Sequence, residues 1–164
     1  MFGKKRKQEN KIPPIVHPVL GEITVSPDLR AANSFDIVLF GKNYPVFLYI
    51  NSPEFHETHA FSVAQEEAIL FFDRNRDQIN TIIEKQLIQF FKINDDMVYN
   101  HKLSLENISI SSHGEIGAFF NSEFSDEDLI AIDSSVNFTD AFGVVIYPDE
   151  RLLYNEQECY VFDN

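Results

Sequence analysis

Cysteine is almost absent from this chain of 164 residues, and tryptophan is entirely absent. The only thiol, Cys159, has no partner for an intramolecular disulfide, and one cysteine is far short of the ligand set of a structural zinc site. The sequence therefore excludes a disulfide-stabilised fold and a cysteine-rich zinc fold. It favours a reducing compartment.

Long apolar runs are missing as well. No stretch reaches about 18 uninterrupted apolar residues, the length that indicates a membrane-spanning helix. The basic start MFGKKRKQENKIPPIV has the charge of a signal peptide, but no apolar run of about 7 to 15 residues follows it. We expect a cytoplasmic protein without membrane insertion.

Basic residues are scarce beyond the first eleven positions, which hold five of the thirteen Lys and Arg residues. Residues 12–164 keep eight basic against twenty-five acidic residues, which is a formal net charge of −17. We interpret residues 1–11 as a disordered basic tail, because so polar a run has nothing to bury. A weak contact with a membrane surface or nucleic acid is the alternative for the tail. The anionic remainder repels nucleic acid and attracts cationic partners.

Sixteen Phe residues and a hydrophobic fraction of 44% indicate a folded interior, so we predict one domain over residues 12–164. Turn residues divide residues 19–50 into short apolar segments, one of them ended by Gly41, with Lys42 and Asn43 as a tight connection. These patterns predict a β-meander or a pair of hairpins. Pro45 is expected at a strand end or edge, because proline cannot donate to a ladder.

The clearest helical signal begins at Ser62, since Ser62 and Gln65 have the spacing of a capping box. Apolar residues then recur with helical spacing as far as about Lys92. One straight helix over this range would be about 45 Å long, more than the roughly 40 Å diameter of a compact chain of this length. We therefore predict a break near Asn75, where Asn75 and Gln78 repeat the cap spacing.

Period-two alternation returns after the helices. It predicts one hairpin over residues 105–120, around His113, and another over 141–155 with its turn at 148–150. Residues 121–141 are compatible with a short helix or with an edge strand. The order of elements predicts an α+β fold, in which a mainly antiparallel sheet carries a helix pair (about 62–92) packed on one face.

No catalytic motif is present. The spacing of three between His56 and His59 differs from the spacing of four in zinc-protease helices, and glycine fingerprints for phosphate loops or dinucleotides are absent. We predict no catalytic residue, no metal ion and no cofactor. The histidines are all expected to be exposed loop residues: His17, His56, His59, His101 and His113.

Six carboxylates gather in the second half of the chain. A solvated surface is the simplest interpretation, and a surface for a cationic partner or a divalent-cation site are the alternatives, although the EF-hand spacing is missing. We treat this cluster as a speculative binding surface. Its members are Glu123, Asp126, Glu127, Asp128, Asp133 and Asp140.

Three adjacent phenylalanine pairs, at 71–72, 90–91 and 119–120, invite comparison with a base-stacking platform. Each pair lies beside an apolar face, which favours a place in the core. The negative charge of the domain also argues against nucleic-acid binding.

Three short motifs resemble small uncharacterised bacterial domains of unknown function: Leu20-Gly21-Glu22 in an opening strand, Gln65 and Ala68 in a capped helix, and Phe142-Gly143-Val144-Val145 in a closing strand. The resemblance covers most of residues 17–162. It implies a single-domain cytoplasmic protein, and some members of that group are of the immunity type found beside secreted toxins. This chain lacks the tryptophan of the later strands, and residues 121–141 look like extra material, so no functional residue is carried over.

Three functions follow as hypotheses. The first is a non-enzymatic binding protein whose anionic surface covers a basic protein, as an immunity protein covers a basic toxin. The second is an enzyme whose site assembles from distant carboxylates with His56, His59 or His113. An accessory domain that acts through the tail is a third, and the sequence leaves the oligomeric state open.

Overall fold

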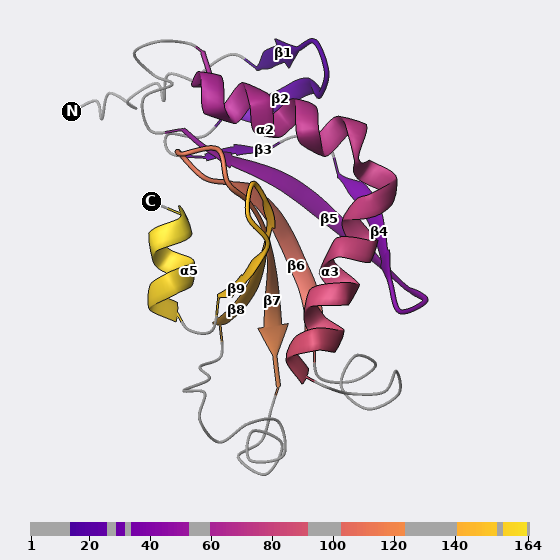
Figure 1. Cartoon of the computed structure of the whole chain (residues 1–164). Coiled ribbons are helices and arrows are strands. Elements are labelled where there is room, and N and C mark those ends of the chain that lie inside the picture. Colours follow the sequence, from indigo (N-terminus) through magenta and orange to yellow (C-terminus); the bar gives the residue numbers. More distant parts are fainter. Residues whose placement is uncertain are drawn as a thin grey trace, which may run out of the picture.

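The computed structural model describes residues 14–25, 29–31, 34–52, 60–91, 103–123, 141–153 and 156–163. These residues form strands and helices arranged as in Figure 1. The strands are β1 (Ile15–His17), β2 (Gly21–Val25), β3 (Leu29–Ala31), β4 (Phe35–Leu39), β5 (Lys42–Asn51), β6 (Leu103–Ile110), β7 (Ile116–Ser122), β8 (Ala141–Tyr147) and β9 (Arg151–Leu153). The helices are α2 (Val63–Arg74), α3 (Arg76–Phe91) and α5 (Glu156–Asp163). The predicted basic tail lies outside the described residues, as does most of 121–141.

Strand pairing runs in the order β1-β2-β3-β5-β6-β7-β8-β9, and β4 pairs with β5. Strands and helices together make an α+β fold, and the strand pairs are mostly antiparallel, as predicted. One pair differs, because β5 and β6 are parallel. Parallel neighbours need a crossover connection, and α2 and α3 lie in the connection between these two strands.

The start of α2 and the break before α3 are as predicted. The Ser62 hydroxyl accepts a hydrogen bond from the Gln65 backbone N–H at 3.2 Å, and Gln65 Oε1 accepts one from the Ser62 N–H at 3.1 Å. Asn75 separates the two helices, but its side chain does not act as the N-cap of α3 that the spacing with Gln78 predicted. Its side-chain amide donates to the Phe71 carbonyl at 2.8 Å, so Asn75 closes the C-terminus of α2.

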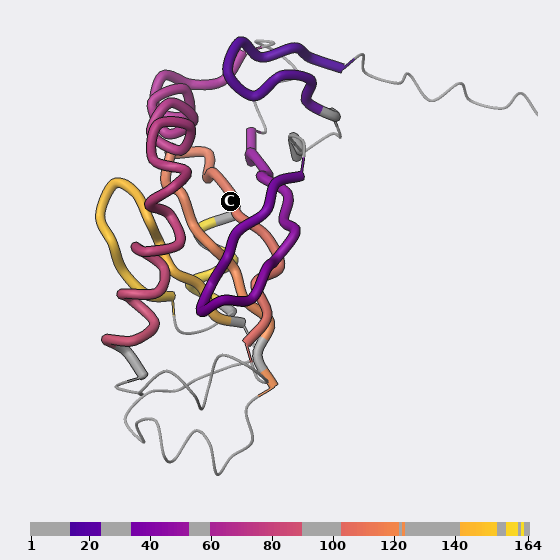
Figure 2. Tube along the Cα trace, turned by 90° about the vertical axis from the view of Figure 1, so that its right-hand side faces the viewer, coloured from indigo at the N-terminus to yellow at the C-terminus, as the bar shows by residue number. Residues whose placement is uncertain are grey.

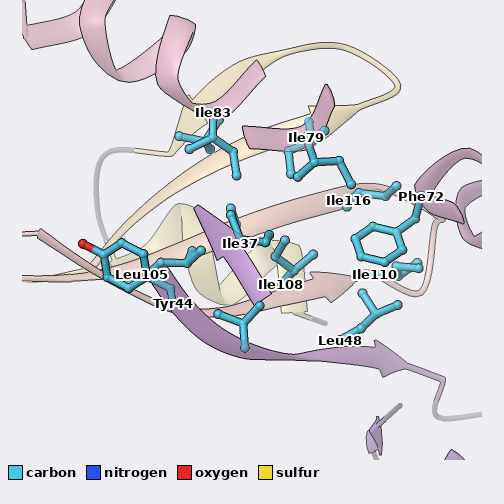
Figure 3. Close-up of a cluster of buried hydrophobic side chains, with 14 of the residues drawn as sticks. Ile37, Tyr44, Leu48, Phe72, Ile79, Ile83, Leu105, Ile108, Ile110 and Ile116 are labelled. Atoms are coloured by element: carbon cyan, nitrogen blue, oxygen red, sulfur yellow. The ribbon is translucent and has the colours of Figure 1, made fainter. Parts of the chain in front are cut away.

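The main core joins both of these helices to the strands. Phe72 of α2 and Ile79 and Ile83 of α3 are fully buried with Ile108 of β6 and Ile116 of β7 (Figure 3). Figure 2 shows α2 and α3 running along one side of β6 and β7. Each fully buried side chain of this kind contributes about 1.5–3 kcal/mol through removal of apolar surface from water.

The phenylalanine pairs belong to the core where their side chains are described. Phe72 and Phe120 are buried, and Phe71 packs against the main core while partly exposed. This confirms the core interpretation for those positions. The side chains of Phe90 and Phe91 lie outside the described set.

A second, smaller core lies beneath α5, a helix that was not predicted. Cys159 and Phe162 of α5 pack against Val145 of β8 and Leu153 of β9, with Phe119 at the side. A Cβ added at Gly117 would lie 2.8 Å from the Phe162 ring. The glycine therefore lets this aromatic ring approach the strand closely.

The hairpins β4–β5, β6–β7 and β8–β9 confirm the predicted hairpins, but the turn of β4–β5 lies at different residues from those predicted. Phe40 and Gly41 form the β4–β5 connection with φ of +49° and +79°, whereas Lys42 already lies in β5. Positive φ at both central residues gives the turn type whose twist suits a two-residue hairpin. The Phe40 N–H donates to Glu84 Oε1 of α3 at 2.7 Å, which fastens the turn to the helix.

Candidate functional site

One side of β4–β7 carries exposed side chains that alternate with the buried ones. Along β5 the residues Tyr44, Val46, Leu48 and Ile50 enter the main core, so their neighbours point the other way. Among the described residues, α5 covers this second side only near β7 to β9. We name the remainder the open face. It comprises Asp36, Val38, Pro45, Phe47, Tyr49, Ser104, Glu106, Asn107 and Asn121.

Two aromatic rings form the apolar part of the open face. The Phe47 side chain is 48% exposed, and its ring centroid lies 6.2 Å from that of Tyr49. The parallel pairing sets Phe47 opposite Asn107, whose Oδ1 accepts a hydrogen bond from the Ser109 hydroxyl at 3.1 Å. The rings thus stand beside a polar side chain that is already held in place.

The sequence contained a signal for this surface. Residues 46–50 of β5 are apolar at odd as well as even positions, which is typical of a strand that meets apolar groups on both sides. The prediction of hairpins used only the segment boundaries, so the second apolar side was missed.

Carboxylates flank the aromatic rings. Asp36 pairs in register with Pro45, two residues from Phe47 along the same side, and Glu106 occupies the β-bulge between Leu105 and Asn107. Neither Asp36 nor Glu106 forms an ion pair with another described residue. Among the described residues, the open face therefore carries negative charge without a paired cation, close to the exposed Phe47 ring and the partly buried Tyr49 ring.

The described basic side chains lie off the open face or are already paired. Lys42 lies over the Tyr44 ring, at 5.0 Å from its centroid. Three other cations contact carboxylates: Arg76 with Asp73 at 3.5 Å, Lys85 with Glu150 at 3.3 Å, and Arg151 with Glu115 at 2.7 Å. Arg74 is in the last turn of α2.

The predicted acidic cluster meets the open face at one residue. Glu123 is exposed and directly follows β7, two positions beyond Asn121. The other members, Asp126, Glu127, Asp128, Asp133 and Asp140, lie outside the described residues.

His17 is buried, so the prediction of an exposed loop residue was wrong. Its Nδ1 accepts hydrogen bonds from the backbone N–H groups of Val19 at 3.2 Å and Leu20 at 3.3 Å. Because those groups can only donate, the ring proton sits on Nε2, which donates to Glu66 Oε2 at 2.9 Å. Both ring nitrogens are thereby used, which suits a structural role and leaves no free base.

Of the three histidines named for a site assembled from distant residues, only His113 lies in the described part of the chain. His113 is exposed in the β6–β7 turn, as predicted. His56, His59 and His101 lie outside the described residues. Across the described ranges no group of three or more His, Cys, Asp or Glu side chains is placed to hold a metal ion.

No protein-family model, curated protein or solved structure matches this chain. Within the described residues, none of the helices has the length and apolar character needed to cross a bilayer.

Proposed function

We propose that this chain is a non-enzymatic binding protein that uses its open face to hold a basic protein. The observation that carries the proposal is the exposed Phe47 ring, next to the partly buried Tyr49 ring and close to Asp36 and Glu106, on a strand surface without a described basic side chain. Aromatic residues are enriched among the side chains that dominate binding energy, and charges around them set the rate and the choice of partner.

Net charge supports the same partner class. The formal charge of the chain is −13, and it is −17 without the first eleven residues. A field of that sign raises the encounter rate with a cationic protein about 10- to 1000-fold at low salt and repels nucleic acid. The specific form of the proposal is an immunity protein that covers a basic toxin.

The arrangement of layers fits this use. We infer that the helix pair α2–α3 serves as the cover of the opposite face, since Phe72, Ile79 and Ile83 enter the core shared with β5–β7. With the helices on that side, a partner can bind the open face on the other side of β5 and β6, where rigid strands would hold it.

Replacing Phe47 by alanine should weaken the partner complex by about 30-fold in Kd, which is the loss of one interface residue worth about 2 kcal/mol. The measurement begins with affinity capture of the tagged protein from its own cell extract at low and high salt, followed by mass spectrometry. A basic protein recovered at low salt and lost at high salt then serves for titration against each variant and for a toxicity assay with co-expression.

A matched pair of double variants separates the open face from net charge. Asp36→Asn with Glu106→Gln and Glu67→Gln with Asp77→Asn both remove two negative charges, the first on the open face and the second on the outer surface of α2 and α3. Only the first should lower the association rate and flatten its salt dependence. Equal effects of the two, or capture of no basic protein at low salt, would contradict the proposal.

A further inference from the structure

The β4 strand has a free edge next to the open face. Its five residues pair with β5 on one side, and no described strand pairs with its other side. Figure 2 shows this edge from outside, with the β4–β5 hairpin toward the viewer. A free strand edge presents backbone N–H and C=O groups with which another chain can pair. The strands at the two ends of the pairing order, β1 and β9, have only three residues each.

The register of the hairpin identifies the backbone groups that face outward. Residue pairs alternate along an antiparallel ladder between those that exchange two hydrogen bonds and those whose N–H and C=O groups point away from each other. Asp36 lies opposite Pro45, which has no N–H and cannot exchange two bonds, so this pair is of the second kind. Val38, two positions along the strand and opposite Asn43, is of the same kind. The backbone groups of Asp36 and Val38 therefore point away from β5, toward the free edge.

These outward groups have no hydrogen-bond partner among the described residues. At the turn end the edge is closed, because the Phe40 N–H donates to Glu84 Oε1 of α3 at 2.7 Å. The side chains of Asp36 and Val38 are both exposed on the open face. The edge thus offers a short row of backbone donors and acceptors beside an exposed carboxylate.

Charge distinguishes between the segments that could pair with this edge. A second copy of the chain would bring a formal charge of −13 to a molecule of the same charge, so repulsion opposes pairing of two copies. An extended segment with Lys or Arg at alternate positions can place all of its cations on the side that carries Asp36, since alternate side chains of a strand share a face. Opposite charges on neighbouring strands attract across that face.

We propose that the basic partner is held by strand addition, in which an extended basic segment pairs with the backbone of Asp36 and Val38 at the free edge of β4. This inference rests on the proposed function of the open face, and it adds the form of the segment and the groups that hold it. Asp36 pairs with Pro45, two residues before Phe47, so the added strand continues the open face. Main-chain bonds supply affinity in this mode of recognition, and side chains supply specificity.

The probe is a synthetic capped peptide in which Lys and Val alternate, and its control is the same sequence with every backbone nitrogen methylated. Both are titrated against the full-length protein and followed by ¹H–¹⁵N spectra and amide hydrogen exchange. The peptide should slow exchange of the Asp36 and Val38 amides by about 10-fold or more, because those amides gain a hydrogen bond. The Ile37 and Leu39 amides, already bonded to β5, should change little. The methylated control should bind at least about 10-fold more weakly.

A pair of variants tests the same edge on the protein. Val38→Pro removes one outward N–H and keeps the bonds between β4 and β5, because proline is tolerated where the N–H faces away from the ladder. It should weaken the peptide, and the captured basic protein, by about 10-fold. Val38→Thr keeps the N–H while changing the side chain, so it should leave both affinities nearly unchanged.

Strand addition is overturned if the peptide shows no saturable binding at millimolar concentration, if the methylated peptide binds equally well, or if the Asp36 and Val38 amides stay unprotected in the complex. None of these results depends on the folding of Val38→Pro. A captured basic protein that is weakened by Phe47→Ala but leaves those amides unprotected would exclude strand addition and keep the open face as the binding site. Pairing of the peptide without capture of any basic protein would instead contradict the proposed function alone.

Discussion

Replacement of Gln65 by leucine should lower the free energy of unfolding by about 3 kcal/mol, although leucine is apolar and similar in volume. The Gln65 side chain is 2% exposed, and its amide nitrogen donates to the carbonyl oxygens of Asn51 at 2.5 Å and Ser111 at 3.2 Å. Its Oε1 accepts the Ser62 N–H. Leucine cannot form these hydrogen bonds, and each buried backbone group left without a hydrogen-bond partner costs about 1–3 kcal/mol.

The position of those carbonyls explains why the effect is large. Asn51 ends β5 and Ser111 follows β6, so one buried amide ties the C-terminal ends of the two parallel strands to the first turn of α2. Parallel strands depend on their crossover for correct placement. Gln65 supplies a direct bond between the crossover and both strands.

Ser62→Ala is the matched control, because it removes the other half of the capping box and touches neither strand. Loss of an N-cap hydroxyl typically costs about 1 kcal/mol. Urea unfolding followed by circular dichroism measures both variants. If Gln65→Leu lost no more stability than Ser62→Ala, the bonds to Asn51 and Ser111 would contribute nothing.

Local features of the fold could be predicted because their causes are local. The capping box at Ser62, the break at Asn75 and the three hairpins depend on residues within a few positions of one another. Length also helped, since a single helix to Lys92 would have exceeded the size of the domain. Short-range spacing and chain dimensions were sufficient for these elements.

Pairing between distant segments could not be predicted in the same way. No local residue pattern indicates that β5 pairs in parallel with the distant β6, where Phe47 lies opposite Asn107, because register is set by packing between distant segments. The prediction that His17 is exposed was wrong for the same reason, because its partner Glu66 belongs to a different element. Helix α5 was missed because its buried residues, such as Cys159 and Phe162, are spread through a polar segment.

The sequence predicted an acidic binding surface but not the aromatic residues of the open face. Excess negative charge indicated a cationic partner, and Glu123 lies next to the open face. The aromatic pair at Phe47 and Tyr49 was absent from the predicted surface, because exposure of apolar residues depends on which side of the strand the helices leave uncovered.

Replacement of Gly114 by alanine should lower the free energy of unfolding by about 4 kcal/mol. Gly114 has φ of +80° in the β6–β7 turn, where an L side chain is strained by about 1–3 kcal/mol. An added Cβ would also lie 2.6 Å from the carbonyl carbon and 2.9 Å from the Cβ of Ala64, in the first turn of α2. Backbone at that distance cannot move aside as a flexible side chain does, so overpacking adds about 1–3 kcal/mol.

Gly41→Ala isolates the conformational part of that loss, because Gly41 has φ of +79° and no atom within 4 Å of an added Cβ. It should therefore lose only about 1–2 kcal/mol, the cost of the left-handed conformation for a residue with a side chain. Urea midpoints of the two variants give the difference directly. A larger loss for Gly114→Ala would mean that the close packing of the β6–β7 turn against Ala64 of α2 contributes to stability. That contact lies near Gln65, which bonds α2 to both parallel strands. Equal losses would mean that α2 shifts to accommodate the new methyl group at no cost. The packing of the turn against Ala64 would then not contribute to the position of the crossover.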